Sequence, residues 1–241
     1  MPTVSLLPAD LLRWLPRLAV MQGGGLESLI KAISGLGQVG PKPEFAHGAN
    51  ADTWPKVRRA LLDSGLLEAI DTGVTDAPML QFHPDLSRWL NANRDTESRL
   101  ETTRNHQRHY FQFAGQLRQR RHRDPQASAL LTRLERANLH HAVDGALAQG
   151  EEWALEFVDR IGELFSEIGE PWDDLHSRAE TLARHLGGDP WRLRLSNQAQ
   201  HLFESREFRA AEQILHELLA GLETDAHFER ASAWARIAHC R

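Results

Sequence analysis

The sequence predicts a mainly α-helical protein, in which a small domain of three helices and a β-hairpin precedes an antiparallel array of helix pairs. Two observations predict the array. From about Glu97 onward, apolar residues recur at steps of three and four with almost no alternation, which is the period of a helix. Glycine and proline separate these segments, as in Gly187-Gly188-Asp189-Pro190, where one helix ends and the next begins. A third observation predicts the hairpin, because two short strand-like runs flank a turn-rich segment between residues 66 and 82.

Residues 1–96 form the first predicted domain. We expect three helices and then two strands, over residues 6–20, 26–33, 54–64, 66–70 and 79–82. Three helices followed by a hairpin is the order of a winged helix, with the hairpin as its wing. In the helix that follows the wing, we expect Trp89 to be buried together with Leu86 and Leu90.

Residues 97–150 are predicted to form a connecting helical pair, and residues 151–241 to form helical repeats. The last pair is similar to a tetratricopeptide repeat, because Ala199 and Ala211 are small residues placed where two helices would cross closely. A repeat array needs a polar cap on its last helix, and the apolar segment near the C-terminus is not one. We therefore expect the array to be truncated at its C-terminus.

The composition is that of a globular domain, with 241 residues of which 41% are hydrophobic and 25% charged. No apolar stretch approaches the ~18–20 residues that a transmembrane helix needs, and the N-terminus lacks the features of a signal peptide. The single cysteine, Cys240, cannot form an internal disulfide, so we expect a cytoplasmic protein. Only three of the 28 Lys and Arg residues are lysines, which indicates a GC-rich bacterial genome.

No pattern of catalytic residues stands out. Residues 35–40 have the letters of a dinucleotide-binding fingerprint, but a helical segment precedes them and prolines follow, so we expect a loop. There is no P-loop sequence and no arrangement typical of a nucleophilic enzyme. His106, His109, His140 and His141 lack a positioned third ligand, so we expect no metal site. The sequence predicts a protein that is not an enzyme and binds no cofactor by itself.

Basic residues suggest two places that could contact DNA or phosphate. The cluster at the end of one long helix is a candidate phosphate patch, although cations are favoured at any helix C-terminus. The group on the third helix of the winged helix would reach a DNA major groove in a DNA-binding version of that fold. The first set is Arg118, Arg120, Arg121 and Arg123, and the second is Lys56, Arg58 and Arg59.

Charge is also distributed unevenly along the chain, which has a formal net charge of −5. Residues 100–123 contain six arginines and one acidic residue, whereas residues 142–190 contain twelve acidic residues and three arginines. Such opposite fields can draw partners, or parts of one chain, toward each other.

Several segments, in their order and spacing, support a family resemblance: Leu7–Gly23, Ala60–Leu67, Phe82–Leu90, Arg104–Tyr110 and Leu134–Leu139. Together they resemble the arm of the bacterial signal-transduction ATPases with numerous domains, the STAND class, which includes the NB-ARC and AP-ATPase-like proteins. In that class an AAA-type nucleotide-binding module is followed by a winged helix and then by tetratricopeptide or similar repeats. The module itself is absent from this sequence.

The resemblance implies a non-enzymatic regulatory arm, whose winged helix docks on a nucleotide module in cis and whose repeats bind a protein or peptide. It implies that ADP or ATP is bound in a longer parent protein, where His83 would contact the phosphates of ADP. Asn197, Gln200 and Glu204 follow i, i+3, i+7 spacing on the first helix of the last repeat, away from the face that carries Ala199, so we expect them to form a peptide-binding face. The alternative is a winged-helix transcription regulator with a repeat sensor, in which Lys56, Arg58 and Arg59 contact DNA.

Overall fold

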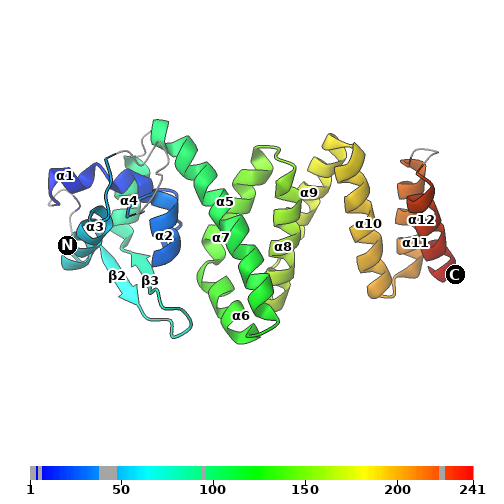
Figure 1. Ribbon diagram of the computed structural model, residues 1–241, viewed down its shortest axis with the longest axis horizontal. Coiled ribbons are helices and arrows are strands. Elements are labelled where there is room, and N and C mark those ends of the chain that lie inside the picture. The colour runs from blue at the N-terminus through cyan, green and yellow to red at the C-terminus, as the bar shows by residue number, and fades with distance from the viewer. Residues whose placement is uncertain (1–3, 5–6, 38–47, 94–95, 223–225, 241) are drawn as a thin grey trace. The chain divides into compact units, whose positions relative to one another are not determined.

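The computed structural model describes residue 4 and residues 7–37, 48–93, 96–222 and 226–240 (Figure 1). The chain divides into two compact units. Met1–Ala148 and Arg160–Pro171 form the first unit, and Gln149–Asp159 and Trp172–Arg241 form the second. The described residues are mainly helical with one small antiparallel sheet, which confirms the predicted fold class at that level.

The start of the first unit is not the single helix that the sequence suggested. The structure has a short helix α1 (Ala9–Leu12) and then a 3₁₀ turn η2 (Leu15–Leu18). Pro16 lies at the start of that turn, where its missing N–H and fixed φ prevent an α-helix from continuing through it. η2 buries Leu15 and Leu18, whereas α1 buries none of its side chains.

The next two helices follow the prediction closely. α2 (Glu27–Ser34) ends at Gly35, which adopts the left-handed conformation with φ of 67°. α3 (Thr53–Asp63) buries Trp54 and Val57 on its inner face. In the predicted loop after α2, residues 38–40 lie outside the described part of the chain.

The sheet contains the predicted hairpin and one further strand. β2 (Leu67–Ile70) and β3 (Met79–Phe82) pair antiparallel, which confirms the hairpin. β1 (Gly24–Leu26) pairs with the other edge of β3, so the strand order is β1-β3-β2. β1 was not predicted, because two glycines in three residues carry little strand propensity.

After β3 the chain enters α4 (Pro84–Ala92), whose first residue is a proline, as is common at the first helical position. Leu86 and Leu90 are buried, four residues apart on one face, and α4 contacts η2. Trp89 is only partly buried, so the expectation that it is buried with Leu86 and Leu90 was wrong. It lies about 100° around the helix from Leu90, at the edge of the buried face.

The range predicted as a connecting helical pair contains α5 (Thr96–Arg121), α6 (Pro125–Leu134) and α7 (Arg136–Ala148), which pack side by side (Figure 1). Asp124 caps α6 by accepting the N–H of Ala127 at 3.0 Å. Glu135, with φ of −97° and ψ of 7°, is the single residue between α6 and α7, and its carboxylate accepts the hydroxyl of Tyr110 in the interior. The first unit ends with the C-terminal part of α8 (Trp153–Ile168).

In the second unit, α9 (Asp173–Leu186), α10 (Gly188–Glu204), α11 (Phe208–Ala220) and α12 (His227–Cys240) follow one another. Contacts join α9 to α10, α10 to α11, and α11 to α12. Ala199 and Ala211, the two predicted small positions, are both buried. The core of α10, α11 and α12 consists of Leu195, Ala199, Leu215, Leu218, Leu219, Ala233 and Ile237.

Candidate functional site

A buried polar cluster joins the sheet to the helices of the first unit, and it is centred on Glu135. This carboxylate is fully buried between α6 and α7. It accepts hydrogen bonds from the backbone N–H of Leu26, from the hydroxyl of Tyr110 at 2.7 Å, and from the amide of Asn138 at 2.9 Å. Burial raises the pKa of Glu135, while these three donors partly offset that effect. The cluster brings together three segments that the sequence analysis singled out separately.

The cluster holds the backbone that enters β1. Asn138 accepts the N–H of Gln22 at 2.7 Å and donates to the carbonyl of Gly24 at 2.8 Å. On the opposite side Gly24 meets β3 so closely that a Cβ there would lie 2.0 Å from the carbonyl oxygen of Leu80. Its φ of 128° also favours glycine. The segment is therefore fixed between the helices and the sheet.

His106 lies beside this cluster on α5, fully buried. Its ring contacts the ring of Tyr110 at 4.6 Å and that of His141 at 5.4 Å between centroids. Neither of its ring nitrogens has a hydrogen-bond partner among the described residues. Burial, reinforced by the nearby His141, lowers the pKa of His106 to about 3. The imidazole is neutral at physiological pH and serves as part of the core.

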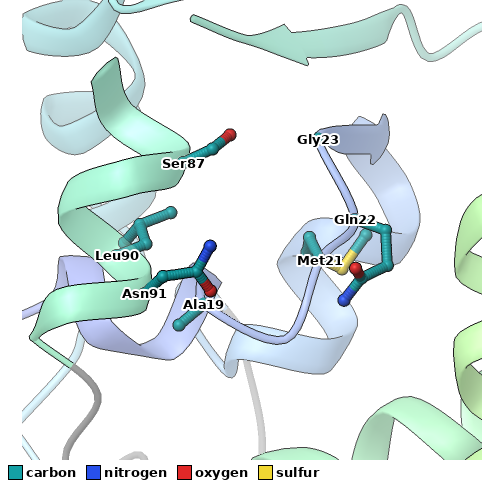
Figure 2. A pocket seen from close by; sticks show the side chains of 7 residues that line it. All are labelled: Ala19, Met21, Gln22, Gly23, Ser87, Leu90 and Asn91. Carbon is teal, nitrogen blue, oxygen red and sulfur yellow. The ribbon is translucent and has the colours of Figure 1, made fainter. Parts of the chain in front are cut away.

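A polar pocket of about 350 Å³ lies in front of the segment that the cluster holds (Figure 2). One wall is α4, from which the Ser87 hydroxyl and the Asn91 amide face the gap, and the other wall is the chain around Gln22 and Gly23 (Figure 2). None of the lining residues is charged, so the pocket offers hydrogen bonds but no fixed charge. The full lining is Ala19, Met21, Gln22, Gly23, Ser87, Leu90 and Asn91.

His83 is the N-cap residue of α4, one turn before Ser87. Its Nδ1 accepts the backbone N–H of Asp85 at 3.2 Å, an arrangement that places the ring proton of the neutral imidazole on Nε2. The side chain is 39% exposed. His83 is therefore a structural cap that still presents an N–H at the start of a helix.

The basic residues on α3 have acidic neighbours. Arg58 pairs with Glu27 at 3.2 Å, and Arg59 pairs with Asp63 at 3.6 Å, both side chains of the second pair being well exposed. Lys56 is exposed on the same helix. The β2–β3 hairpin, residues 67–82, contains three carboxylates and neither lysine nor arginine. The surface around α3 therefore has no excess of positive charge.

The arginine cluster at the end of α5 also faces carboxylates. Arg118 pairs with Glu163 of α8 at 2.7 Å, and Arg121 pairs with Glu163 at 3.4 Å and with Glu167 at 3.1 Å. Arg120 donates to the carbonyl of Val74, in the turn between β2 and β3, at 2.9 Å. Some of the arginines in the basic part of the sequence thus form ion pairs with carboxylates from its acidic part, within the first unit. Arg123 is exposed beyond the end of α5.

In the second unit an apolar hollow of about 340 Å³ lies between α10 and α12. Its base is formed by Ala199 and Leu215, which are both buried. Gln200, one of the three residues expected to bind a peptide, lines it, whereas Asn197 is exposed elsewhere on α10 and the side chain of Glu204 is not described. The full lining is Ala199, Gln200, Phe203, Leu215, Ser232, Ala235 and Arg236.

The residues that α12 contributes to this hollow were not predicted, because the face of α12 that meets α10 depends on tertiary packing. No role was predicted for Glu135 and Asn138 either. A buried Glu three residues before an Asn has no signature that separates it from an exposed pair on a helix.

Among the described residues, no group of three potential metal ligands comes together. The helices of the described part are all too short or too polar to cross a membrane. Comparisons with protein-family models, with curated proteins and with solved structures found no match to this chain.

Proposed function

We propose that this chain is a non-catalytic regulatory and protein-interaction arm of a cytoplasmic signalling ATPase of the STAND class. In this proposal the first unit docks on a nucleotide-binding module of the same polypeptide, and the helices of the second unit bind a partner protein or peptide. The observation that carries the proposal is the hollow between α10 and α12, because it is open, apolar at its base and polar at its rim.

The packing of α10, α11 and α12 supports a tetratricopeptide-like array. Ala199 and Ala211 are 2% and 0% exposed, as expected of small residues where paired helices cross closely. α10 and α12 would be the first helices of two successive pairs, and the hollow lies between them. Arrays of this kind bind ligands on the extended surface that such successive helices create.

The order of elements supports a winged helix in the first unit. A short strand, β1, follows the first helical segment, then come α2, α3 and the β2–β3 hairpin, and β1 joins the free edge of β3. β3 leads directly to His83, the residue that the resemblance assigns to contact with the phosphates of ADP. A ring N–H at a helix start can donate to a phosphate oxygen, and the helix dipole favours an anion there.

The nucleotide contact would need the missing module, so this chain alone should show no measurable affinity for ADP. In a parent protein that contains the module, His83→Ala should weaken ADP binding and shift the population toward the open state. Equal ADP affinity for the unmodified parent and the variant would leave His83 with its capping role only.

The alternative, a DNA-binding winged helix using Lys56, Arg58 and Arg59, is less favoured by the charges. Two of these three residues are paired with carboxylates, and the charged residues of the β2–β3 hairpin are all acidic. DNA affinity depends on neutralising phosphates and falls steeply with salt. Titration with random duplex DNA at low salt should show no binding, and salt-sensitive binding would support the alternative instead.

The partner-binding role can be tested by filling the hollow. Ala235 lines it and is exposed, so Ala235→Trp should occupy the space without disturbing the core. Ala238→Trp is the matched control, because Ala238 is exposed on the same helix but does not line the hollow. Peptides selected from a random library on the full chain should lose binding to the first variant and retain it on the second. Selected peptides that bind both variants equally would show that the hollow is not the binding face.

A further inference from the structure

We infer that the hollow between α10 and α12 selects a protein segment in which an apolar side chain lies next to a carboxylate. This inference rests on the proposed partner-binding function and adds the chemistry of the partner. Its basis is the lining itself, in which apolar groups form the base and a single charged residue, Arg236, lies at the rim.

The base of the hollow requires an apolar group. Ala199 and Leu215 are each 2% exposed, and Phe203 adds an aromatic ring that also contacts Phe208 at 5.4 Å between centroids. A volume of about 340 Å³ is at the small end of the ~300–1,000 Å³ typical of ligand pockets. It suits one large apolar side chain with its adjoining backbone.

The rim determines what flanks that side chain. Gln200 and Ser232 carry an amide and a hydroxyl, which are suited to hydrogen bonds with a peptide backbone. None of the lining residues is acidic. The electrostatic complement of this rim is therefore a single negative charge near Arg236.

Arg236 differs from Arg194 on α10 and Arg230 on α12, whose guanidinium groups are bound within the protein. Arg194 is 5% exposed and is paired with Asp159, and Arg230 donates to the carbonyls of Leu219 and Leu222 at 3.3 Å. Arg236 is exposed, and within the described residues it makes no ion pair of 4.0 Å or less. A guanidinium in this position can form a bidentate pair with a carboxylate.

Long-range electrostatics oppose an acidic partner, because the chain has a net charge of −5. The preference must therefore arise from direct contact with Arg236, and it should disappear when that one charge is removed. A charge-assisted hydrogen bond at a partly exposed site should favour the acidic segment by about tenfold in affinity.

The test uses two arrays of synthetic nonapeptides, identical except at one position. In both, the central residue is Leu or Phe; in one array it is followed by Asp, and in the other by Asn. Dissociation constants are measured by fluorescence anisotropy for the unmodified full chain, Arg236→Gln, Ala235→Trp and the control Ala238→Trp. Circular dichroism establishes that each variant is folded.

We expect the Asp peptides to bind about tenfold more tightly than the Asn peptides to the unmodified chain and to Ala238→Trp. Arg236→Gln should remove this difference while retaining the affinity for the Asn peptides, and Ala235→Trp should abolish both. If both arrays bind equally well and Ala235→Trp abolishes that binding, the carboxylate preference is overturned, whereas the partner-binding function still stands. A preference for Asp that survives in Arg236→Gln would overturn the role of Arg236. Absence of binding to either array, or binding unaffected by Ala235→Trp, would overturn the inference together with the function on which it rests.

Discussion

Replacing His106 by leucine should make the protein less sensitive to acid. The side chain is fully buried, and its pKa is lowered from 6.5 to about 3 by burial and by the nearby His141. In the unfolded chain the same imidazole takes up a proton near pH 6.5. The unfolded state therefore binds one more proton than the folded state between these two pKa values. The stability that this group contributes is fully present above pH 6.5 and is lost as the pH falls toward 3.

The expected magnitude follows from this difference in proton binding. Each pH unit between the two pKa values costs ~1.4 kcal/mol of the free energy of unfolding. Acidification from pH 6.5 to pH 4.5 should thus remove about 2–3 kcal/mol through His106 alone, a large part of the ~5–15 kcal/mol typical of a domain. Glu135 acts in the opposite direction, because its raised pKa favours the folded state at low pH. It is present in both proteins, so its effect cancels in the comparison.

The assay is urea unfolding of the full chain, followed by far-ultraviolet circular dichroism at pH values from 7.5 to 4.5. At pH 7.5, His106→Leu should be about as stable as the unmodified protein or more so, because it removes two buried nitrogens without partners. The difference in its favour should grow by about 2–3 kcal/mol at pH 4.5. His122→Leu, at an exposed position after α5, is the control and should show no such growth. An unchanged pH dependence in His106→Leu would refute the burial of an unprotonated imidazole.

Four other substitutions test the packing of the first unit by the same unfolding assay. Asn138→Ala should cost ~2–4 kcal/mol, because it removes the partner of the part-buried N–H of Gln22 and of the buried carbonyl of Gly24. A loss below ~1 kcal/mol would show that water replaces the amide. Gly24→Ala should prevent stable folding, since the added Cβ would overlap the carbonyl of Leu80, and a soluble variant with a native spectrum would contradict the register of β1. Leu90→Ala should cost ~2–5 kcal/mol and Trp89→Ala less, because Leu90 is 2% exposed and Trp89 only partly buried; the reverse order would restore the original expectation for Trp89.

The sequence by itself determined most of the secondary structure. Helical periodicity and the placement of glycine and proline are local signals, and they located α2, α3 and the β2–β3 hairpin within a few residues. The prediction of a single helix over residues 6–20 was wrong. It relied on the apolar spacing of this segment, whereas Pro16, which has no backbone N–H, determined the structure. β1 escaped notice because its strand conformation comes from its partners, Asn138 behind it and β3 beside it, and not from its own residues.

Only the tertiary structure decided which residues form sites. Glu135 and Tyr110 are 25 positions apart in the sequence, and Asn138 is 116 positions from Gln22, so no local pattern could predict that they form one cluster. The same holds for the hollow, where Gln200 was expected from its helix face but Ala235 and Arg236 were not, since α12 had no predicted orientation. Periodicity shows that a helix has a buried face, but what covers that face depends on contacts between residues distant in the chain. Those contacts also determine whether a charged side chain is paired, as Arg118 is with Glu163, or left exposed, as Arg236 is.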